Sequence, residues 1–380
     1  NGQSSAAVAA LDGGRFVAIW TSFGQDGNFG GIYGQLYGPN GQPVGDEFPI
    51  NTTTEGSQVF ASVAALPGGG FVVTWSSVAP QGGPSDIYGQ RYDDTGQPEG
   101  VEFLINTETD GDQRYSSVAA FGDGSFVVTW TSTGADSGIY GRRFNADGEP
   151  DGDAFRISGE QAVVSSGQNT ATSAVAMLED GGFVVAWMSF GQDGDGAGIY
   201  ARRYGEDGQP EGGEFLVHPG AIAGNQTQPS VSALADGFII TWTSGDTNQH
   251  GVYGQLYGAG GAAVGDAFLI NTETAGAQTG STVTALSDGG FLVTWTSQGQ
   301  DGSGAGVYGQ RFDEDGQRVG SEFRVNETTS GNQSTLPGIG ANLVAELEDG
   351  SVVSVWQAAV GSSPPNNEIY GRIFNVPGEV

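Results

Sequence analysis

The stretch FLVTWTSQGQDGSGAGVYGQRF, residues 291–312, decides the fold of this protein. Two runs rich in β-branched and aromatic residues flank a glycine-rich stretch, which is typical of two β-strands joined by a loop. In the copy of the first run at residues 71–75, Phe71, Val73 and Trp75 share one face, and Val72 and Thr74 share the other. Both faces are largely apolar, so we expect a sheet packed between two neighbours.

The same pattern recurs along the whole chain of 380 residues. Each copy has one tryptophan that ends an apolar run, and a tyrosine follows 10 to 14 residues later. The tryptophans are Trp20, Trp75, Trp130, Trp187, Trp242, Trp295 and Trp356. We therefore expect a single domain, 1–380, with seven repeats at about residues 1–57, 58–112, 113–167, 168–225, 226–277, 278–332 and 333–380.

Each repeat contains up to four strand-like segments, which in the second repeat are residues 62–66, 70–77, 87–92 and 102–106. Asp-Gly and Gly-Gly turns between the first two segments supply the positive φ that hairpins need. Short connections make consecutive strands antiparallel neighbours. The sequence therefore predicts an all-β, seven-bladed β-propeller with four-stranded antiparallel blades and the first segment innermost. The last repeat has three such segments, so we expect a three-stranded last blade, with its fourth strand missing or supplied by residues outside this sequence.

The composition excludes several classes of protein. All 12 basic residues are arginines, against 44 acidic residues, so the net charge is −32. Nucleic-acid binding needs a basic face, which isolated arginines do not provide. The chain has no cysteine and no apolar run long enough to span a membrane. We expect a secreted, extracellular, acidic protein with no transmembrane segment and no nucleic-acid partner.

The loops between second and third segments and those after the fourth segments lie at the same end of the sheets. They are polar and variable, which is typical of loops that bind ligands. Sugar recognition combines planar hydrogen-bonding side chains with aromatic platforms. The ligand-binding candidates are Phe23, Gln25, Phe190, Gln192, His250 and Gln300. The tryptophans end apolar runs, so we interpret them as core residues between blades.

Calcium is the metal that these loops suggest. Asp26, Asp193 and Asp301 occupy the same place in three Gly-Gln-Asp-Gly loops. Calcium prefers hard oxygen ligands, and backbone and amide oxygens near each aspartate could complete a site. The alternative is a turn in which the aspartate accepts hydrogen bonds from local amides.

Catalytic motifs are absent from the sequence, so no catalytic residue is proposed. His218 and His250 are lone histidines. Asp193 and Asp246 could cleave a glycosidic bond if the fold brought them to a suitable separation.

The string FVVTWTS…GQDG…GIYGQRFD, seen at residues 291–313 and in its copies, resembles a propeller-type repeat of large secreted bacterial proteins. Those proteins are associated with hemolysin-type (RTX-like) calcium-binding repeats. The resemblance implies an extracellular module that acts in adhesion or surface binding and depends on calcium, although the calcium-binding nonapeptide GGxGxDxUx itself is absent.

The leading hypothesis is a secreted, non-enzymatic module that binds carbohydrate or a cell-surface component in a lectin-like or adhesive manner, assisted by calcium. One alternative is a structural module of a bacterial surface layer or appendage that associates with itself. The other alternative is a polysaccharide-degrading enzyme.

Overall fold

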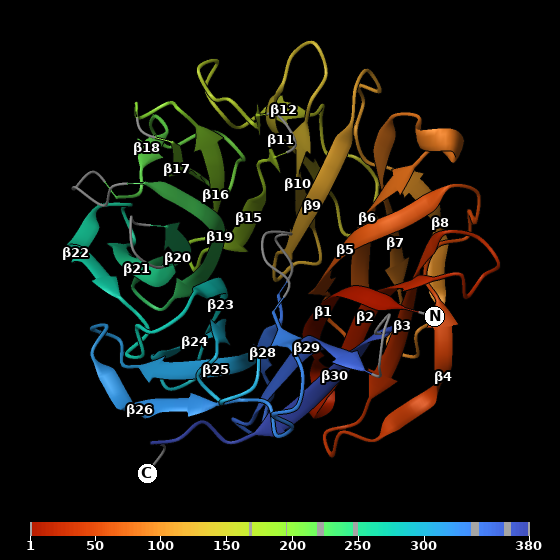
Figure 1. Cartoon of the computed structure of the whole chain (residues 1–380). Coiled ribbons are helices and arrows are strands. Elements are labelled where there is room, and N and C mark those ends of the chain that lie inside the picture. The colour runs from red at the N-terminus through yellow and green to blue at the C-terminus, as the bar shows by residue number, and fades with distance from the viewer. Residues whose placement is uncertain are drawn as a thin grey trace.

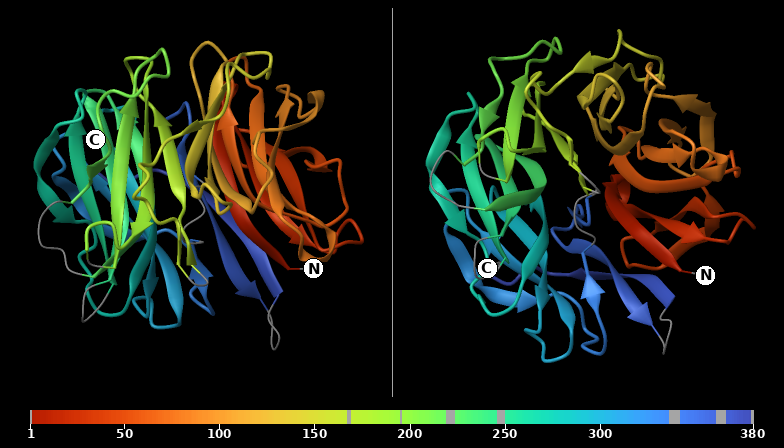
Figure 2. Two further views of the ribbon diagram at one scale, coloured as in Figure 1. Left: turned by 90° about the horizontal axis from the view of Figure 1, so that it is seen from above. Right: turned by 45° about the horizontal axis from the view of Figure 1, so that its top comes forward.

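The computed structural model describes residues 2–166, 169–194, 196–218, 224–245, 250–335, 342–360 and 366–378. The described chain is built from β-strands, with two short 3₁₀ turns, η1 (Asp12–Gly14) and η2 (Pro80–Gly82). The sheets stand side by side around a central axis, which makes the fold an all-β propeller (Figures 1 and 2). None of the helices in these residues has the length and apolar character that crossing a membrane would need.

The first segments of the repeats form the strands around the axis, where each contacts the next (Figure 1). These inner strands are β1 (Gln3–Leu11), β5 (Ser57–Ala65), β9 (Gln113–Ala120), β15 (Ser173–Met177), β19 (Asn225–Leu234), β23 (Gln278–Ala285), β27 (Gln333–Ser334) and β28 (Val344–Glu346). The second segments follow as β2 (Arg15–Phe23), β6 (Phe71–Val78), β10 (Phe126–Ser132), β16 (Phe183–Phe190), β20 (Gly237–Gly245), β24 (Phe291–Gln298) and β29 (Val352–Val360).

The third and fourth segments lie progressively farther from the axis. The third strands are β3 (Gly30–Tyr37), β7 (Ser85–Tyr92), β11 (Gly138–Phe144), β17 (Ala197–Tyr204), β21 (His250–Gly258), β25 (Ala305–Phe312) and β30 (Asn366–Phe374). The outermost strands are β4 (Pro43–Pro49), β8 (Pro98–Leu104), β12 (Phe155–Arg156), β18 (Phe215–Leu216), β22 (Ala263–Leu269) and β26 (Arg318–Arg324). A small hairpin of β13 (Ser165–Ser166) and β14 (Asn169–Thr170) precedes β15.

The prediction of seven separate four-stranded blades is wrong. The described residues form five separate four-stranded sheets, whereas β1 to β8 belong to one eight-stranded sheet. A parallel pairing of Gly30 with Ser57 joins the first two repeats into that sheet. A Cβ atom at Gly30 would lie 2.9 Å from the Ser57 hydroxyl oxygen, so the missing side chain is what lets the two backbones approach.

The last blade also differs from its prediction, because it is a four-stranded sheet. The first segment of this repeat is divided into β27 and β28, and both pair with β29. No described strand pairs with the outer edge of β30.

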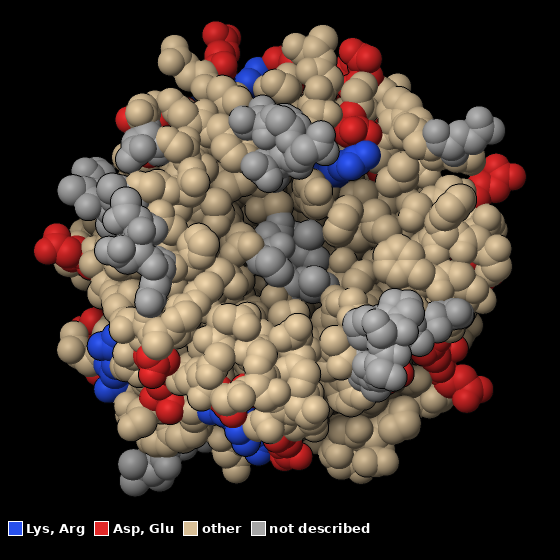
Figure 3. Space-filling model, viewed as in Figure 1, with Lys and Arg blue, Asp and Glu red and all other residues tan. Residues whose placement is uncertain are grey.

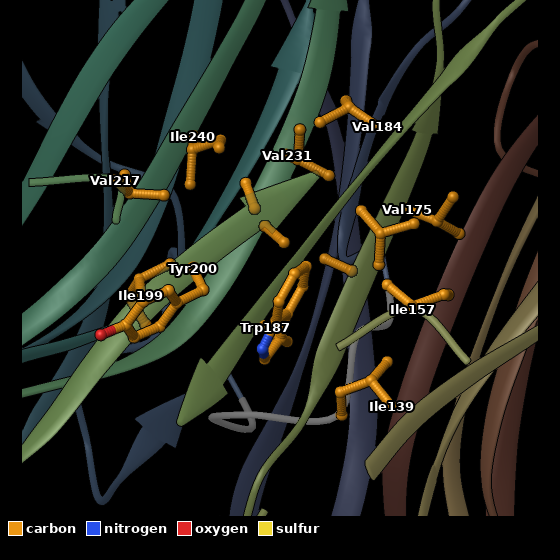
Figure 4. Close-up of a cluster of buried hydrophobic side chains, with 14 of the residues drawn as sticks. Ile139, Ile157, Val175, Val184, Trp187, Ile199, Tyr200, Val217, Val231 and Ile240 are labelled. Carbon is orange, nitrogen blue, oxygen red and sulfur yellow. The ribbon is translucent and has the colours of Figure 1, made fainter. Parts of the chain in front are cut away.

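The core lies between neighbouring sheets. Trp75, Trp187, Trp242 and Trp295 are completely buried, which confirms that these tryptophans are core residues. Figure 4 shows Trp187 among aliphatic side chains from adjacent sheets. Aromatic pairs tie second strands to third strands, as in Phe183 and Tyr204, whose ring centroids are 4.6 Å apart. The second strands are therefore largely buried on both faces, as the strand pattern predicts.

The ring is closed by contacts between the first and last repeats. The Val8 amide donates to the Asn342 carbonyl at 2.8 Å, and the Gly13 amide donates to the Glu348 carboxylate at 2.7 Å. Ala6, Val8, Phe16, Ala18 and Trp20 form one apolar cluster with residues of the last repeat. The ring of sheets is thus closed by side-chain packing, by a backbone–backbone hydrogen bond and by a hydrogen bond from a backbone amide to a carboxylate.

We predict that two tryptophans with equal burial differ in how much a phenylalanine substitution costs. The Trp295 indole donates to the Gln278 side chain at 2.9 Å, whereas the Trp75 indole has no partner among the described residues. Both Trp→Phe changes remove similar volume, but only Trp295→Phe leaves a buried acceptor unpaired. It should lower the free energy of unfolding by about 1 kcal/mol more than Trp75→Phe in denaturant titrations. Equal losses would contradict the assigned hydrogen bond.

Candidate functional site

The loops after second strands and the loops after fourth strands lie at one end of the sheets, as antiparallel pairing requires. Carboxylates are scattered around the rim of the face seen in Figure 3, and basic residues are few there. The predicted ligand-binding and metal-binding residues all fall in or beside these loops. The structure distributes them over several repeats and does not gather them into one cluster.

The three predicted glutamines are tied to glutamates of the outermost strands. Gln192 donates to Glu214 at 2.7 Å, and Gln300 donates to Glu322 at 2.6 Å. Gln25 makes the same contact with Glu47. Each glutamine therefore fastens its loop across the sheet through its amide nitrogen, whereas the buried amide oxygens of Gln192 and Gln300 have no partner among the described residues. Ligand binding by these glutamines stays a prediction.

The predicted aspartates of the Gly-Gln-Asp-Gly loops lie against the backbone of the third strands. Oδ1 of Asp26 accepts from the Asn28 amide at 2.9 Å, and Oδ1 of Asp301 accepts from the Ser303 amide at 2.9 Å. The Oδ2 atoms of these two aspartates are buried and have no hydrogen-bond partner in the described part of the chain. Asp26 and Asp301 thus accept hydrogen bonds from nearby backbone amides, as the alternative interpretation of these loops predicts.

Asp26, Asp193 and Asp301 belong to three different sheets. Among the described residues, no group of three histidine, cysteine or acidic side chains is placed to hold a metal ion. Calcium therefore stays a prediction. It would need one separate site in each loop, with a single carboxylate and several neutral oxygens.

The remaining predicted residues are isolated from one another. Phe23 is 42 % exposed and Phe190 is partly buried. His250 opens β21 and pairs with Gly245 across the strand. Asp246, the proposed partner of Asp193, lies outside the described residues.

His218 has a structural role. Its Nε2 atom accepts a hydrogen bond from the Ile199 amide at 3.5 Å, at the place where Asn51 accepts from Ile32 in the first repeat. Burial lowers the pKa of His218, although the charge of Asp193 opposes that shift. The neutral ring is suited to accept this bond.

The Gly-Gln-Asp-Gly loops cover the tyrosines of their own repeats. Where the loop is present, Tyr33, Tyr200 and Tyr308 are only 8 %, 6 % and 7 % exposed. The third repeat has the shorter loop TGADSG, and its Tyr140 is partly exposed. In the last repeat Tyr370 is 42 % exposed. Loop sequence thus decides which repeats present an open surface.

The open surface of the third repeat forms a cavity of about 470 Å³, which we call the Trp130–Tyr140 pocket. The two rings are stacked with centroids 6.3 Å apart. The carboxylates of Glu108, Asp110 and Asp136 line the same cavity. A smaller cavity of about 370 Å³ occupies the corresponding place beside Trp356 and Tyr370.

Hydrogen bonds hold the walls of the Trp130–Tyr140 pocket in place. The Trp130 indole donates to Gln113 at 3.0 Å, and Gln113 donates to the Asp110 carbonyl at 3.2 Å. Arg156 donates to Asp136 at 2.5 Å and also to the Ser137 carbonyl at 2.8 Å. The polar groups are therefore oriented before any ligand arrives.

The electrostatics of the pocket centre on the Tyr140 hydroxyl, which donates to the Asp136 carbonyl at 2.9 Å. Burial and then the hydrogen bond and charge of Asp136 raise the pKa of Tyr140 to about 12. Glu108 adds to this shift and Arg156 opposes it. Two carboxylates thus act on one neutral hydroxyl.

Sequence reasoning missed Glu108, Asp136 and Tyr140 as site residues. The pocket exists because the third repeat lacks the Gly-Gln-Asp-Gly loop that several other repeats share. The signal available in the sequence was the short loop at residues 133–138, the shortest connection between second and third segments.

Comparison with known proteins shows which folds the structure resembles, but it assigns the chain to no family. No family model matches the chain, and no curated protein matches it. Among solved structures, the polysaccharide lyase Uly1 has a TM-score of 0.56 at 12% identity, covering 97% of this chain and 89% of its own. The α-L-arabinofuranosidase arb93a of Fusarium graminearum has a TM-score of 0.55 at 11% identity, covering 84% of this chain and 93% of its own. At this identity the likeness shows the fold alone.

A third solved structure, the α-L-arabinanase of Penicillium chrysogenum, has a TM-score of 0.53 at 14% identity and covers 84% of this chain and 93% of its own. All three proteins are carbohydrate-active enzymes, and none is a lectin or adhesin. The main prediction, a non-enzymatic, lectin-like or adhesive binding module, is contradicted by these comparisons.

We predict that the protein loses stability as pH rises from 10 towards 12. The folded state keeps the Tyr140 proton up to a pKa of about 12, whereas a free tyrosine loses it near 10.0. The folded state therefore binds more protons in this window, and the free energy of unfolding falls as pH rises. Tyr200 and Tyr204, whose pKa values are also raised to about 12, act in the same direction.

Tyr140→Phe should make the fall in unfolding free energy shallower, as measured by denaturant titrations at several pH values. Identical pH dependence of the parent and the variant would contradict the assignment of Tyr140.

Proposed function

We propose that the chain is a carbohydrate-active enzyme that hydrolyses glycosidic bonds of a neutral extracellular polysaccharide in the Trp130–Tyr140 pocket. The observation that carries the proposal is the presence of two acidic residues, Glu108 and Asp136, near the hydroxyl of the partly exposed Tyr140 and beside an aromatic wall. Most glycosidases use such a pair of carboxylates. The likeness of the fold to carbohydrate-active enzymes supports the same class.

The surroundings of the two carboxylates suggest different roles. Asp136 is paired with Arg156, which fixes the position of its carboxylate, so we assign to Asp136 the attack on the anomeric carbon or the activation of water. Glu108 is exposed and makes no ion pair among the described residues, so it is the candidate proton donor to the leaving oxygen. Tyr140 holds the Asp136 backbone and acts as a positioning residue.

The charge of the pocket favours hydrolysis of a neutral chain over elimination on an acidic one. Elimination from a uronate requires a cation that neutralises the substrate carboxylate. Arg156 is the basic residue beside the pocket, and it already bonds Asp136 and three backbone carbonyls, of Ser137, Ser158 and Gly159. Glu108 and Asp110 also line the pocket, and together with Asp136 they would repel a polyanion.

The extracellular location and the calcium ion remain proposals. The acidic composition, without lysine or cysteine, supports the first. The buried, unpaired Oδ2 atoms of Asp26 and Asp301 support the second. We expect a calorimetric calcium titration to show binding by the parent and none by the combined Asp26→Ala, Asp193→Ala and Asp301→Ala variant. Equal heats from both proteins would remove the calcium proposal.

We predict that activity depends on both carboxylates. The whole chain should release reducing ends from a neutral polysaccharide such as arabinan or galactan. Glu108→Gln and Asp136→Asn should each lower kcat/KM by about 100-fold or more, because proton transfer and nucleophilic assistance are lost. Thermal unfolding of each variant checks that the fold is kept.

Asp94→Asn is the matched control, because Asp94 lies in a turn at the opposite end of the sheets. It should keep parental activity. Cleavage that survives both pocket substitutions would contradict the proposed site. An unsaturated, ultraviolet-absorbing product from uronate polymers would contradict hydrolysis.

A further inference from the structure

Glutamates of the outermost strands join neighbouring repeats at the loop face. Glu102 of β8 accepts from the Thr52 amide of the preceding repeat at 2.8 Å and from the Thr52 hydroxyl at 2.9 Å. Glu322 of β26 accepts from the amide and the hydroxyl of Thr272 at 2.7 Å and 2.8 Å. Each threonine directly follows the asparagine that ends a fourth segment. Its backbone N–H and its hydroxyl form a pair of donors, which we call the threonine cradle, and a carboxylate of the next repeat fills it.

The junction between the third and fourth repeats keeps the same contact with a simpler donor. The Gly159 amide donates to Glu214 at 2.7 Å. Gly159 stands at the position of Thr52 and Thr272, but it has no hydroxyl to add. The contact between a glutamate and the preceding repeat therefore occurs at three junctions, so it is a regular feature of this fold.

The junction between the second and third repeats has the donors but lacks the glutamate. Thr107 follows Asn106, as Thr52 follows Asn51, but the glutamate position of the third repeat holds Ala154. Neither the amide nor the hydroxyl of Thr107 donates a hydrogen bond within the part of the chain that the structure describes. The threonine cradle is thus present here without an acceptor from the protein.

This threonine cradle belongs to the Trp130–Tyr140 pocket, because Thr107 and Ala154 both line that cavity. The second repeat shows where the missing carboxylate would lie. Burial raises the pKa of Tyr88, the counterpart of Tyr140, and the charges of Asp86 and Glu102 raise it further. A group that binds Thr107 in place of a glutamate would therefore lie near the Tyr140 ring.

The surroundings of Thr107 favour a hydroxyl group over a carboxylate as its acceptor. In the sixth repeat Glu322 also accepts from the loop residue Gln300 at 2.6 Å, and the shorter loop of the third repeat has no glutamine. The carboxylates of Glu108 and Asp136 in the pocket would repel a further negative charge. A hydroxyl can accept from the Thr107 amide and donate its own hydrogen to a carboxylate.

We propose that the amide and hydroxyl of Thr107 form a subsite that binds a hydroxyl group of a neutral sugar residue. The inference rests on the proposed function, because it names part of the substrate-binding site in the same pocket. Thr107 is a positioning residue: it holds the sugar beside Tyr140 and takes no part in proton transfer. Ala154 is the residue that keeps the subsite open, since a glutamate there would fill the cradle as Glu102 does at Thr52.

The test measures cleavage of a neutral polysaccharide by the whole chain and by variants of the cradle. Ala154→Gln brings an uncharged acceptor to the cradle, so it should raise KM by about tenfold or more and leave kcat within about twofold. Ala154→Glu should raise KM at least as much. Thr107→Val removes the hydroxyl and keeps the amide, so it should raise KM by about threefold to tenfold. A loss confined to Ala154→Glu would show charge repulsion and would contradict the subsite.

Ala267→Gln is the matched control, because Ala267 holds the same position in the fifth repeat and does not line the pocket. The residue after His218, which corresponds to Thr107, is Pro219, and proline has no amide hydrogen. The control should keep parental kcat and KM. Ala154→Gln should unfold at a higher temperature than Ala267→Gln, because only Ala154→Gln gains a hydrogen bond. Equal unfolding temperatures would contradict the unfilled cradle without reference to any substrate.

A binding measurement separates failure of the subsite from failure of the proposed function. Arabinan and galactan oligosaccharides are titrated by calorimetry into the chain carrying Asp136→Asn, which should not cleave them. Adding Ala154→Gln should weaken binding by about tenfold. If the parent cleaves no neutral polysaccharide but this loss of binding is seen, the proposed function is wrong and the subsite is supported.

Three results would overturn the subsite. The first is cleavage by the parent with unchanged KM in Ala154→Gln and Thr107→Val, which would leave the proposed function intact. The second is the absence of saturable binding of both oligosaccharides. The third is tighter binding of a galacturonate oligosaccharide than of the neutral ones, which would show that the cradle takes a carboxylate.

Discussion

The structure depends on burying both faces of every sheet against its neighbours. A strand such as β6 has apolar side chains on both faces, so it cannot stand at a surface without exposing Val72 or Trp75. A radial arrangement satisfies this constraint for all the inner sheets at once (Figure 1). Burial of about 25 cal/mol for each Å² of apolar area is the dominant stabilising term in such a fold.

Polar contacts then set the details at the ends of the sheets. In repeats with the Gly-Gln-Asp-Gly loop, the glutamine reaches a glutamate of the outermost strand and the tyrosine below is covered. The third repeat lacks this loop, and its Tyr140 opens onto a pocket with three carboxylates. The location of the candidate site on this face is therefore determined by the third repeat, whose loop differs from the pattern that several other repeats share.

The two open regions differ in the side chains that line them. The Trp130–Tyr140 pocket combines fixed hydrogen-bonding groups with acidic side chains, which fits a neutral sugar chain. The cavity between the first and last repeats is lined by polar side chains such as Gln3, Glu47 and Arg372 as well as by apolar and aromatic ones. Neither region includes the loops that carry Asp26, Asp193 or Asp301. The glutamines beside those aspartates fasten the loops, so the motif repeated most clearly is structural in its observed contacts.

Sequence alone determined the all-β class, the order of strands within a repeat and the burial of the tryptophans. These features follow from residue types at short spacing, because strand propensity, alternation and turn chemistry are local properties. The number of separate sheets, the division of the last inner strand and the location of the pocket were decided by tertiary structure. They depend on approaches between distant residues, such as Gly30 with Ser57 or Glu108 with Tyr140, and no local pattern encodes those distances.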